Sequence, residues 1–148
     1  MQPSPPELEQ KIELRIRTIR TLWFALLVSV LMYFVLTLFI GKPKNATPNN
    51  LLSVVLAGAG VFTTLLSLVI KSKFLARSVE QQRVDMVQQG YLIAWVLCET
   101  AALLGLLDFF VTGNRLYWVS FVVAAIGQLV NFPRRQDVLA ASFKTPTF

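Results

Sequence analysis

Four long apolar stretches, almost free of charged side chains, constrain the fold of this chain more than any other feature. They cover about residues 21–40, 51–70, 90–112 and 116–132. About twenty such residues are what an α-helix needs to cross the hydrocarbon of a bilayer. We therefore predict an all-α integral membrane protein that is a bundle of four membrane-spanning helices.

Composition supports one membrane domain over residues 1–148. The chain is 55% hydrophobic and only 15% charged, with a mean hydropathy of +0.59. A typical soluble domain is about 25% charged. The net charge of +6 comes from basic residues that cluster between the apolar stretches. No basic patch alternates with aromatic residues, so we do not expect nucleic-acid binding.

Basic residues also predict the orientation, because they are enriched in cytoplasmic loops. The side that receives residues 1–20, the loop 71–89 and the tail 133–148 carries most of them. The opposite side carries only Lys42, Lys44 and Arg115. We therefore expect both termini in the cytoplasm.

The first twenty residues have the pattern of a juxtamembrane amphipathic helix. Ser4-Pro5-Pro6-Glu7 has the spacing of a capping box with prolines at a helix start, and Ile12, Ile16 and Ile19 recur at helical spacing. Mixed acidic and basic residues argue against a signal peptide. We expect this helix to lie along the inner membrane surface or to rise from it.

Small residues predict where spans two and three pack closely, since they let helix backbones approach each other in a membrane. On span three they form one stripe with Cys98, which we interpret as a small apolar filler. The expected partner is the stretch 57–60 of span two. The predicted packing residues are Gly58, Gly60, Gly90, Ala94, Ala101 and Gly105.

Glu99 is the residue most suggestive of chemistry, because it lies near the middle of span three. A charge at that depth is costly, so we expect the neutral acid. Counting along each span places Thr63, Thr64 and Ser29 at a similar depth as hydrogen-bond partners. Two interpretations stay open. Glu99 binds a proton or small cation, or it forms an interhelical hydrogen bond.

Glu99 lies well around the helix from the small-residue stripe, beside Trp95 and Ala102. This position predicts that it faces span four, a second subunit or lipid. Asp108, nearer the outer end, is expected to reach outside water or Arg115 and to help fix the turn.

Polar residues at the inner end of span four are assigned simple roles. Gln128 and Asn131 are interpreted as snorkelling or helix-capping side chains. The pair Arg134 and Arg135 is expected to bind anionic lipid headgroups.

Residues 51–112 resemble the helical hairpin of the proteolipid ring subunit of rotary ATP synthases. The resemblance rests on Ala57-Gly58-Ala59-Gly60, the polar loop around Arg77 to Arg83, and Leu97-Cys98-Glu99-Thr100-Ala101. It implies that Glu99 carries a proton. The whole pattern also resembles small bacterial four-helix membrane proteins, which implies no mechanism.

The sequence contains none of the motifs of soluble-type enzymes. It has no phosphate-binding loop, no histidine and one cysteine. We therefore expect no catalytic residues, no cofactor and no metal. The first hypothesis is a non-catalytic accessory, assembly or scaffold subunit of a larger membrane complex, whose partners are lipid and other subunits or copies of itself. The alternative is a proton- or cation-handling protein that uses Glu99. The short loops favour a bacterial inner membrane.

Overall fold

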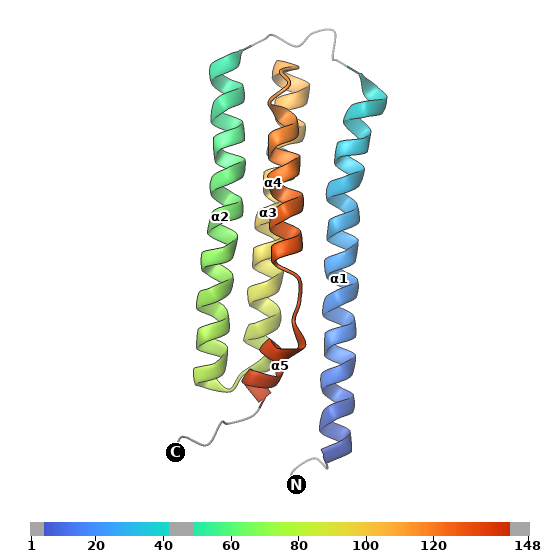
Figure 1. Ribbon diagram of the computed structural model, residues 1–148, viewed down its shortest axis with the longest axis vertical. Helices are drawn as coiled ribbons and strands as arrows, with labels where there is room; N and C mark the ends of the chain where they lie inside the picture. The colour runs from blue at the N-terminus through green and yellow to red at the C-terminus, as the bar shows by residue number, and fades with distance from the viewer. Residues whose placement is uncertain (1–4, 42–48, 143–148) are drawn as a thin grey trace.

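The computed structural model describes residues 5–41 and 49–142, and within them the fold is all-α (Figure 1). Lys42, Lys44, Ser4 and the last six residues of the predicted tail lie outside the described residues. The helices, in chain order, are α1 (Pro5–Ile40), α2 (Asn50–Gln81), α3 (Val84–Thr112), α4 (Tyr117–Val130) and α5 (Arg135–Ser142).

Three of these helices are long and apolar enough to cross a membrane. They are Ile12–Ile40, Asn50–Gln81 and Val84–Thr112. Helix α4 is apolar but has only 14 residues, which is a length of about 21 Å. The structure thus supports a membrane protein with three long apolar helices, and the predicted fourth span is shorter than a bilayer-crossing helix.

The predicted juxtamembrane helix is not a separate element. Helix α1 continues without a break from Pro5 to Ile40, so residues 5–20 extend the first apolar stretch (Figure 1). No proline or glycine interrupts the sequence between Glu7 and Ile40, and no other residue types break a helix as strongly. The described part of the segment therefore forms one continuous helix with the first apolar stretch.

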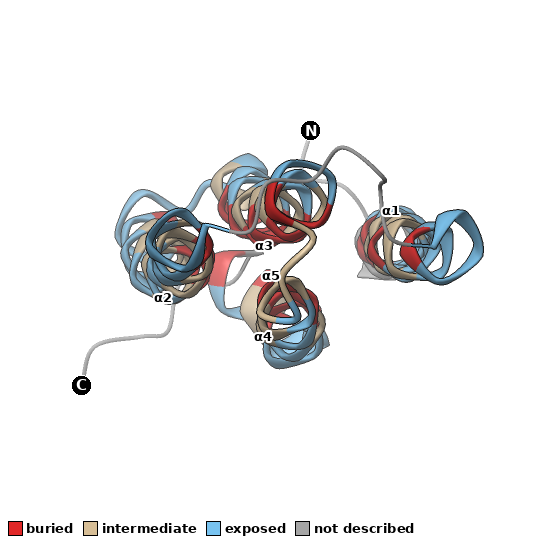
Figure 2. Ribbon diagram, turned by 90° about the horizontal axis from the view of Figure 1, so that it is seen from above, coloured by how far each residue is buried: buried red, intermediate tan, exposed pale blue. Residues whose placement is uncertain are grey.

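Helix α3 lies at the centre of the bundle. Along the apolar window of each helix, 44% of α3 is buried, against 22% of α2 and 11% of α1. Viewed from above, α2 and α1 lie on opposite sides of α3 and α4 (Figure 2). Among the described residues α1 contacts α3, α4 and α5 but not α2. The consecutive helices α1 and α2 therefore do not pack against each other.

The core has two parts, and the first lies at the end of the bundle that holds both termini (Figure 1). There the isoleucine stripe of α1 meets the beginning of α3 and one face of α5. The buried members are Ile12, Ile16, Ile19, Val87, Tyr91, Trp95, Val138 and Ala141. This packing explains the helical spacing of the isoleucines, because their stripe covers other helices of the chain. The second part lies among α1, α3 and α4 and comprises Val30, Ala101, Ala102, Phe121 and Ala124.

The turn between α2 and α3 falls where the polar loop predicts it. Gln82 adopts a left-handed backbone conformation with φ of 52°, and its backbone N–H bonds the carbonyl oxygens of Ser78 and Val79. Near this turn Leu75 and Met86 are half-buried, whereas Val79 is 41% exposed.

Five of the six predicted small residues lie in close helix contacts, but the expected partner, the stretch 57–60 of α2, is not the neighbour of Gly90, which meets Phe74, or of Gly105, which meets α4. Ala94 and Ala101 are fully buried, and Gly60, Gly90 and Gly105 each lie against a neighbouring helix. A Cβ atom on Gly105 would stand 2.9 Å from the Ser120 Cβ of α4.

Gly58 is the exception. It is exposed, and a Cβ atom there would meet nothing within 4 Å. The face of α2 that packs on α3 passes through Gly60, and Gly58 lies on the opposite side.

Candidate functional site

Glu99 lies in the interface between α3 and α1. Its Oε1 accepts a 2.8 Å hydrogen bond from the Ser29 hydroxyl and a 3.2 Å bond from the Tyr33 hydroxyl. Ser29 and Tyr33 are one turn apart on α1, so both point at the same spot on α3. No described side chain bonds Oε2, and Glu99 as a whole is half-buried. The carboxyl group is thus held on one oxygen and reachable on the other.

Two of the three partners proposed for Glu99 are wrong. Ser29 is confirmed, but the hydroxyls of Thr63 and Thr64 both donate 3.0 Å bonds to the Gly60 carbonyl oxygen of their own helix. The depth of a residue along its helix does not specify the direction in which its side chain points around that helix. Helix α2 packs on the other side of α3, so equal depth does not bring the threonines to Glu99.

Glu99 faces α1, the helix of its predicted partner Ser29, and not the neighbours predicted from its position around α3. Span four, a second subunit and lipid were the proposed neighbours, and α1 supplies the actual contacts. Trp95 and Ala102, beside Glu99 on α3, are fully buried, since this side of α3 is covered by α1. Tyr33 is a partner that sequence reasoning missed. The signal for it is its spacing of four residues from Ser29.

Asp108 is fully buried, so the prediction that it meets outside water or Arg115 is wrong. Its Oδ2 accepts a 2.7 Å bond from the Ser53 hydroxyl of α2. Its Oδ1 accepts a 2.7 Å bond from the Thr112 hydroxyl one turn along α3. The backbone N–H of Asn114 bonds the same Thr112 hydroxyl. Asp108 therefore joins α2, α3 and the following turn, so it still helps to fix that turn.

Gln128 and Asn131 are also fully buried, which excludes snorkelling. The Asn131 amide Nδ2 donates to the Ser67 hydroxyl at 3.2 Å and approaches the Cys98 sulfur at 3.8 Å. The Ser67 hydroxyl and the Cys98 sulfur are 3.5 Å apart. Asn131 does hold the C-cap position of α4. Its side chain, however, ties α4 to α2 and α3, because α4 ends inside the bundle.

Two tryptophans complete this polar group around the end of α4. The Trp95 indole N–H donates to the Asn131 carbonyl oxygen at 3.0 Å, and the Trp23 indole N–H donates to the Gln128 carbonyl oxygen at 2.8 Å. The Gln128 amide in turn donates to the Trp95 carbonyl oxygen at 3.3 Å. The last carbonyl groups of a helix have no partner within it, and indole groups from α1 and α3 satisfy two of them here.

Three buried side-chain oxygens in the described residues have no hydrogen-bond partner. They are Ser120 Oγ, Gln128 Oε1 and Asn131 Oδ1. Gln128 and Asn131 each use their amide nitrogen, so each leaves its oxygen free. These unpaired oxygens lower the stability that the polar cluster contributes, and they do not form a set of ligands for a metal ion. Among the described residues, no three His, Cys, Asp or Glu side chains could hold a metal ion.

At the end with both termini, charged and aromatic groups fasten α5 to the bundle. The Tyr91 hydroxyl donates to the Asp137 carboxylate and accepts a 3.2 Å bond from the Arg134 backbone N–H. The Lys71 ammonium lies 4.6 Å from the centre of the Tyr91 ring. Arg134 and Arg135 are exposed, and their binding to lipid headgroups stays a prediction.

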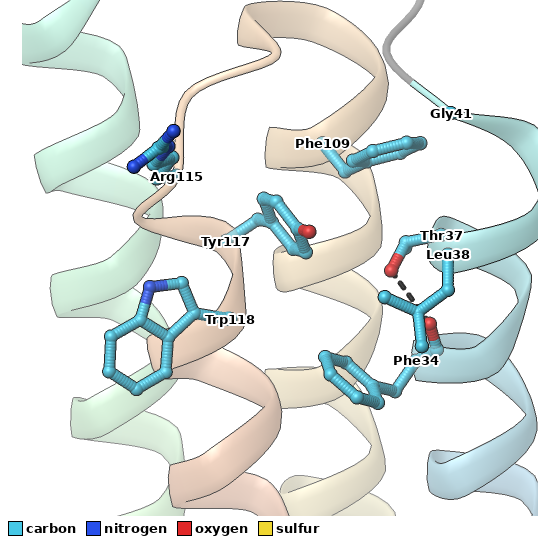
Figure 3. Close-up of a pocket in the computed structure, with 8 residues that line it drawn as sticks. All are labelled: Phe34, Thr37, Leu38, Gly41, Phe109, Arg115, Tyr117 and Trp118. Carbon is cyan, nitrogen blue, oxygen red and sulfur yellow. Dashed lines mark hydrogen bonds between the residues drawn. The ribbon is translucent and has the colours of Figure 1, made fainter.

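A cavity of about 440 Å³ opens at the opposite end, between α1 and the start of α4 (Figure 3). Figure 3 shows Phe34, Thr37 and Leu38 on α1, with Tyr117 and Trp118 on α4 across the gap. The Thr37 hydroxyl donates a 2.7 Å hydrogen bond to the Phe34 carbonyl oxygen. Arg115, just before α4, is the only charged group among the described lining residues. The cavity therefore has aromatic walls and one cation.

No protein-family model, curated protein or solved structure matches the chain. The arguments for function accordingly rest on its own residues. Their arrangement can join helices through buried polar groups, and it leaves one acid, Glu99, half-exposed between α3 and α1.

Proposed function

We propose that this chain is a small non-catalytic membrane protein that serves as an accessory, assembly or scaffold subunit of a larger membrane complex. In this proposal the short helix α4 also crosses the membrane, so the chain has four spans and both termini lie on the cytoplasmic side of a bacterial inner membrane. The observation that carries the proposal is the use of the buried polar groups. Asp108, Asn131 and Gln128 join helices to one another, and no described pocket contains any of them.

The exposure of α1 supports contact with other proteins. Only 11% of its apolar window is buried, and large side chains such as Phe24, Met32 and Phe39 are at least 61% exposed. Lipid covers such a face as well as protein does. A helix that packs on only one side of its own bundle nevertheless leaves the rest free for a second subunit. We assign the outward face of α1 to that contact.

The test is the mass and composition of the particle extracted from the native membrane in mild detergent. The proposal expects a particle much heavier than one chain that contains other subunits. The variant Met32→Trp adds bulk to the outward face of α1 but keeps it apolar, so it should insert normally and lose the partners. Phe62→Trp, on a 65% exposed position of α2, is the matched control and should keep them. A particle that contains a single chain in both detergent and lipid nanodiscs refutes the proposal.

The second candidate function is proton or cation handling by Glu99. The observation that favours it is the carboxyl geometry, with Ser29 and Tyr33 on one oxygen and no described side chain on the other. The resemblance of residues 51–112 to the ring-subunit hairpin of rotary ATP synthases supports the same idea. Intramembrane acids are functional more often than not.

This candidate is tested with a carbodiimide, which modifies carboxylic acids in apolar surroundings. Selective labelling of Glu99, with loss of ion movement in Glu99→Gln, would support it. The matched control is Asp108→Asn, because Asp108 is also a carboxylic acid but is fully buried and bonded on both oxygens. If Glu99→Gln leaves ion flux and growth unchanged, the candidate fails, and the interhelical hydrogen bonds to α1 suffice to explain Glu99.

A further inference from the structure

The interface between α1 and α4 is open along its outer half. Two neighbouring hollows lie there, one of about 440 Å³ at the end near Arg115 and one of about 200 Å³ further in. Phe34 lines both, so the two hollows adjoin where its ring packs against Phe121 of α4, with 5.5 Å between ring centroids. We name the two hollows together the α1–α4 seam. Its described lining residues are Val30, Leu31, Phe34, Thr37, Leu38, Gly41, Phe109, Arg115, Tyr117, Trp118, Phe121, Val122 and Ala125.

The inner hollow of the seam is entirely apolar. Its walls are side chains such as Val30, Leu31 and Val122, and no polar side chain lines it. Water in such a space would find no hydrogen-bond partner, whereas a hydrocarbon chain would lose nothing by entering it. Leu31 and Val122 are 49% and 44% exposed, so the hollow opens to the surroundings of the bundle. In a bilayer these surroundings are acyl chains.

The outer hollow adds a charge and two aromatic side chains with polar tips. Tyr117 and Trp118 belong to the residue types that concentrate at the level of lipid headgroups. Arg115 is exposed and makes no ion pair with any described residue. Asp108, the acid nearest to it along the chain, has both oxygens bonded by Ser53 and Thr112. A guanidinium group without a protein counter-ion is therefore available to an anion from outside the chain.

We propose that the α1–α4 seam binds an anionic phospholipid of the leaflet that contains the turn before α4. One acyl chain lies along Phe34 and Phe121 into the apolar hollow, and the phosphate group meets Arg115. A lipid combines a long apolar part with a single negative charge, which matches the order of groups along the seam. The size of the outer hollow lies within the range of about 300–1,000 Å³ that small-molecule sites occupy. The inference requires insertion in a bilayer but no partner subunit.

The first experiment counts lipids on the full-length protein by native mass spectrometry, after nanodiscs of phosphatidylglycerol or phosphatidylcholine are exchanged into mild detergent. We expect one phosphatidylglycerol to be retained. Arg115→Gln should weaken its retention about fivefold, because one basic residue near a surface contributes about that factor. It should leave phosphatidylcholine unaffected. Ala125→Phe fills the inner hollow and should weaken the retention of both lipids.

The control for charge is Arg77→Gln, since Arg77 is an exposed residue near the other end of the bundle. It should retain the lipid as the wild type does. Equal retention by Arg115→Gln and the wild type would overturn the proposal, and so would an equal loss in Arg77→Gln. If Ala125→Phe retained both lipids as the wild type does, the result would contradict the proposed acyl-chain site.

A second measurement does not depend on retention in detergent. Brominated lipids quench nearby tryptophans, and Trp118 lines the mouth while Trp95 is fully buried. Brominated phosphatidylglycerol should quench the wild-type fluorescence more than brominated phosphatidylcholine at the same density. This excess should disappear in Trp118→Phe and in Arg115→Gln. Identical quenching by the two lipids in the wild type contradicts the proposal.

Discussion

The Ser53 hydroxyl on α2 donates a 2.7 Å hydrogen bond to the Asp108 carboxyl on α3, and both side chains are fully buried. The two residues are 55 positions apart in the sequence. Their bond closes the α2–α3 pair at the end opposite its short turn, so the two helices are fixed at both ends.

Removal of the Ser53 hydroxyl should therefore weaken the α2–α3 pair. Interhelical hydrogen bonds in membranes contribute about 0.6 kcal/mol on average and up to about 1.7, and we expect Ser53→Ala to cost an amount within that range. Asp108→Ala leaves the Ser53 hydroxyl unpaired and the Thr112 hydroxyl with only the backbone carbonyl oxygen of residue 108, so it should cost more, about 1–3 kcal/mol. Ser72→Ala, at an exposed hydroxyl that bonds only its own helix, should have little effect. Reversible unfolding in mixed detergent micelles measures the three variants, and equal losses for Ser53→Ala and Ser72→Ala would contradict the prediction.

Gly127 should not tolerate a methyl group. A Cβ atom there would lie 2.5 Å from the Thr64 Cγ2 and 2.8 Å from the Cys98 sulfur. Gly127→Ala should therefore destabilise the bundle by about 1–3 kcal/mol, as overpacking does. Gly58→Ala is the matched control, because a Cβ atom there meets nothing within 4 Å.

Chemical labelling of the single cysteine provides a second test of Gly127→Ala and Gly58→Ala. Cys98 is fully buried, so a maleimide should label it in the wild type only after unfolding. Labelling should be faster in Gly127→Ala and unchanged in Gly58→Ala. If Cys98 were labelled in Gly127→Ala at the wild-type rate, α4 would accommodate the added methyl group by shifting without loss of stability, and the prediction would be wrong.

The Tyr91 hydroxyl should hold α5 on the bundle. In Tyr91→Phe the Asp137 carboxylate and the Arg134 backbone N–H lose their shared partner. We expect hydrogen exchange of the described residues of α5 to rise while the centre of α3 stays protected. Tyr117→Phe, whose hydroxyl bonds no described residue, should leave the exchange of α5 unchanged. Faster exchange along all of α3 in Tyr91→Phe would indicate general unfolding and would count against a local role.

Trp23 should fasten α1 to the end of α4. Its indole N–H bonds the Gln128 carbonyl oxygen at 2.8 Å, and its ring meets Phe132 edge-on at 5.0 Å between centroids. Trp23→Phe keeps an aromatic ring but loses the hydrogen bond, so a loss of about 0.5–1.5 kcal/mol is expected. Phe24→Leu changes the neighbouring, 61% exposed side chain and should be neutral in the same unfolding assay.

Hydropathy and small residues predicted much of the fold. The first three apolar stretches lie within α1, α2 and α3, the fourth extends beyond both ends of α4, and the polar loop holds the turn at Gln82. Gly60, Gly90 and Gly105 pack as expected because a small residue on a stripe allows close approach whichever helix provides the neighbour.

The candidate site was predicted less well, because depth along a helix does not specify direction around it. Ser29, Thr63 and Thr64 have similar depths, but only Ser29 lies on a helix that faces Glu99. Asp108 sits near a helix end, which suggested contact with water. Its burial depends on Ser53, which the sequence does not mark as its partner.

The placement of α1 has a consequence for biogenesis. The ribosome makes α1 before α3, α4 and α5, and the described residues that α1 contacts belong to those three later helices. Until α3 emerges, the Ser29 and Tyr33 hydroxyls lack the carboxyl group that they bond in the finished bundle. Helix α1 must therefore be stable in the bilayer as an independent segment until α3 is made. Its apolar length is sufficient for this, because it can cross the hydrocarbon on its own.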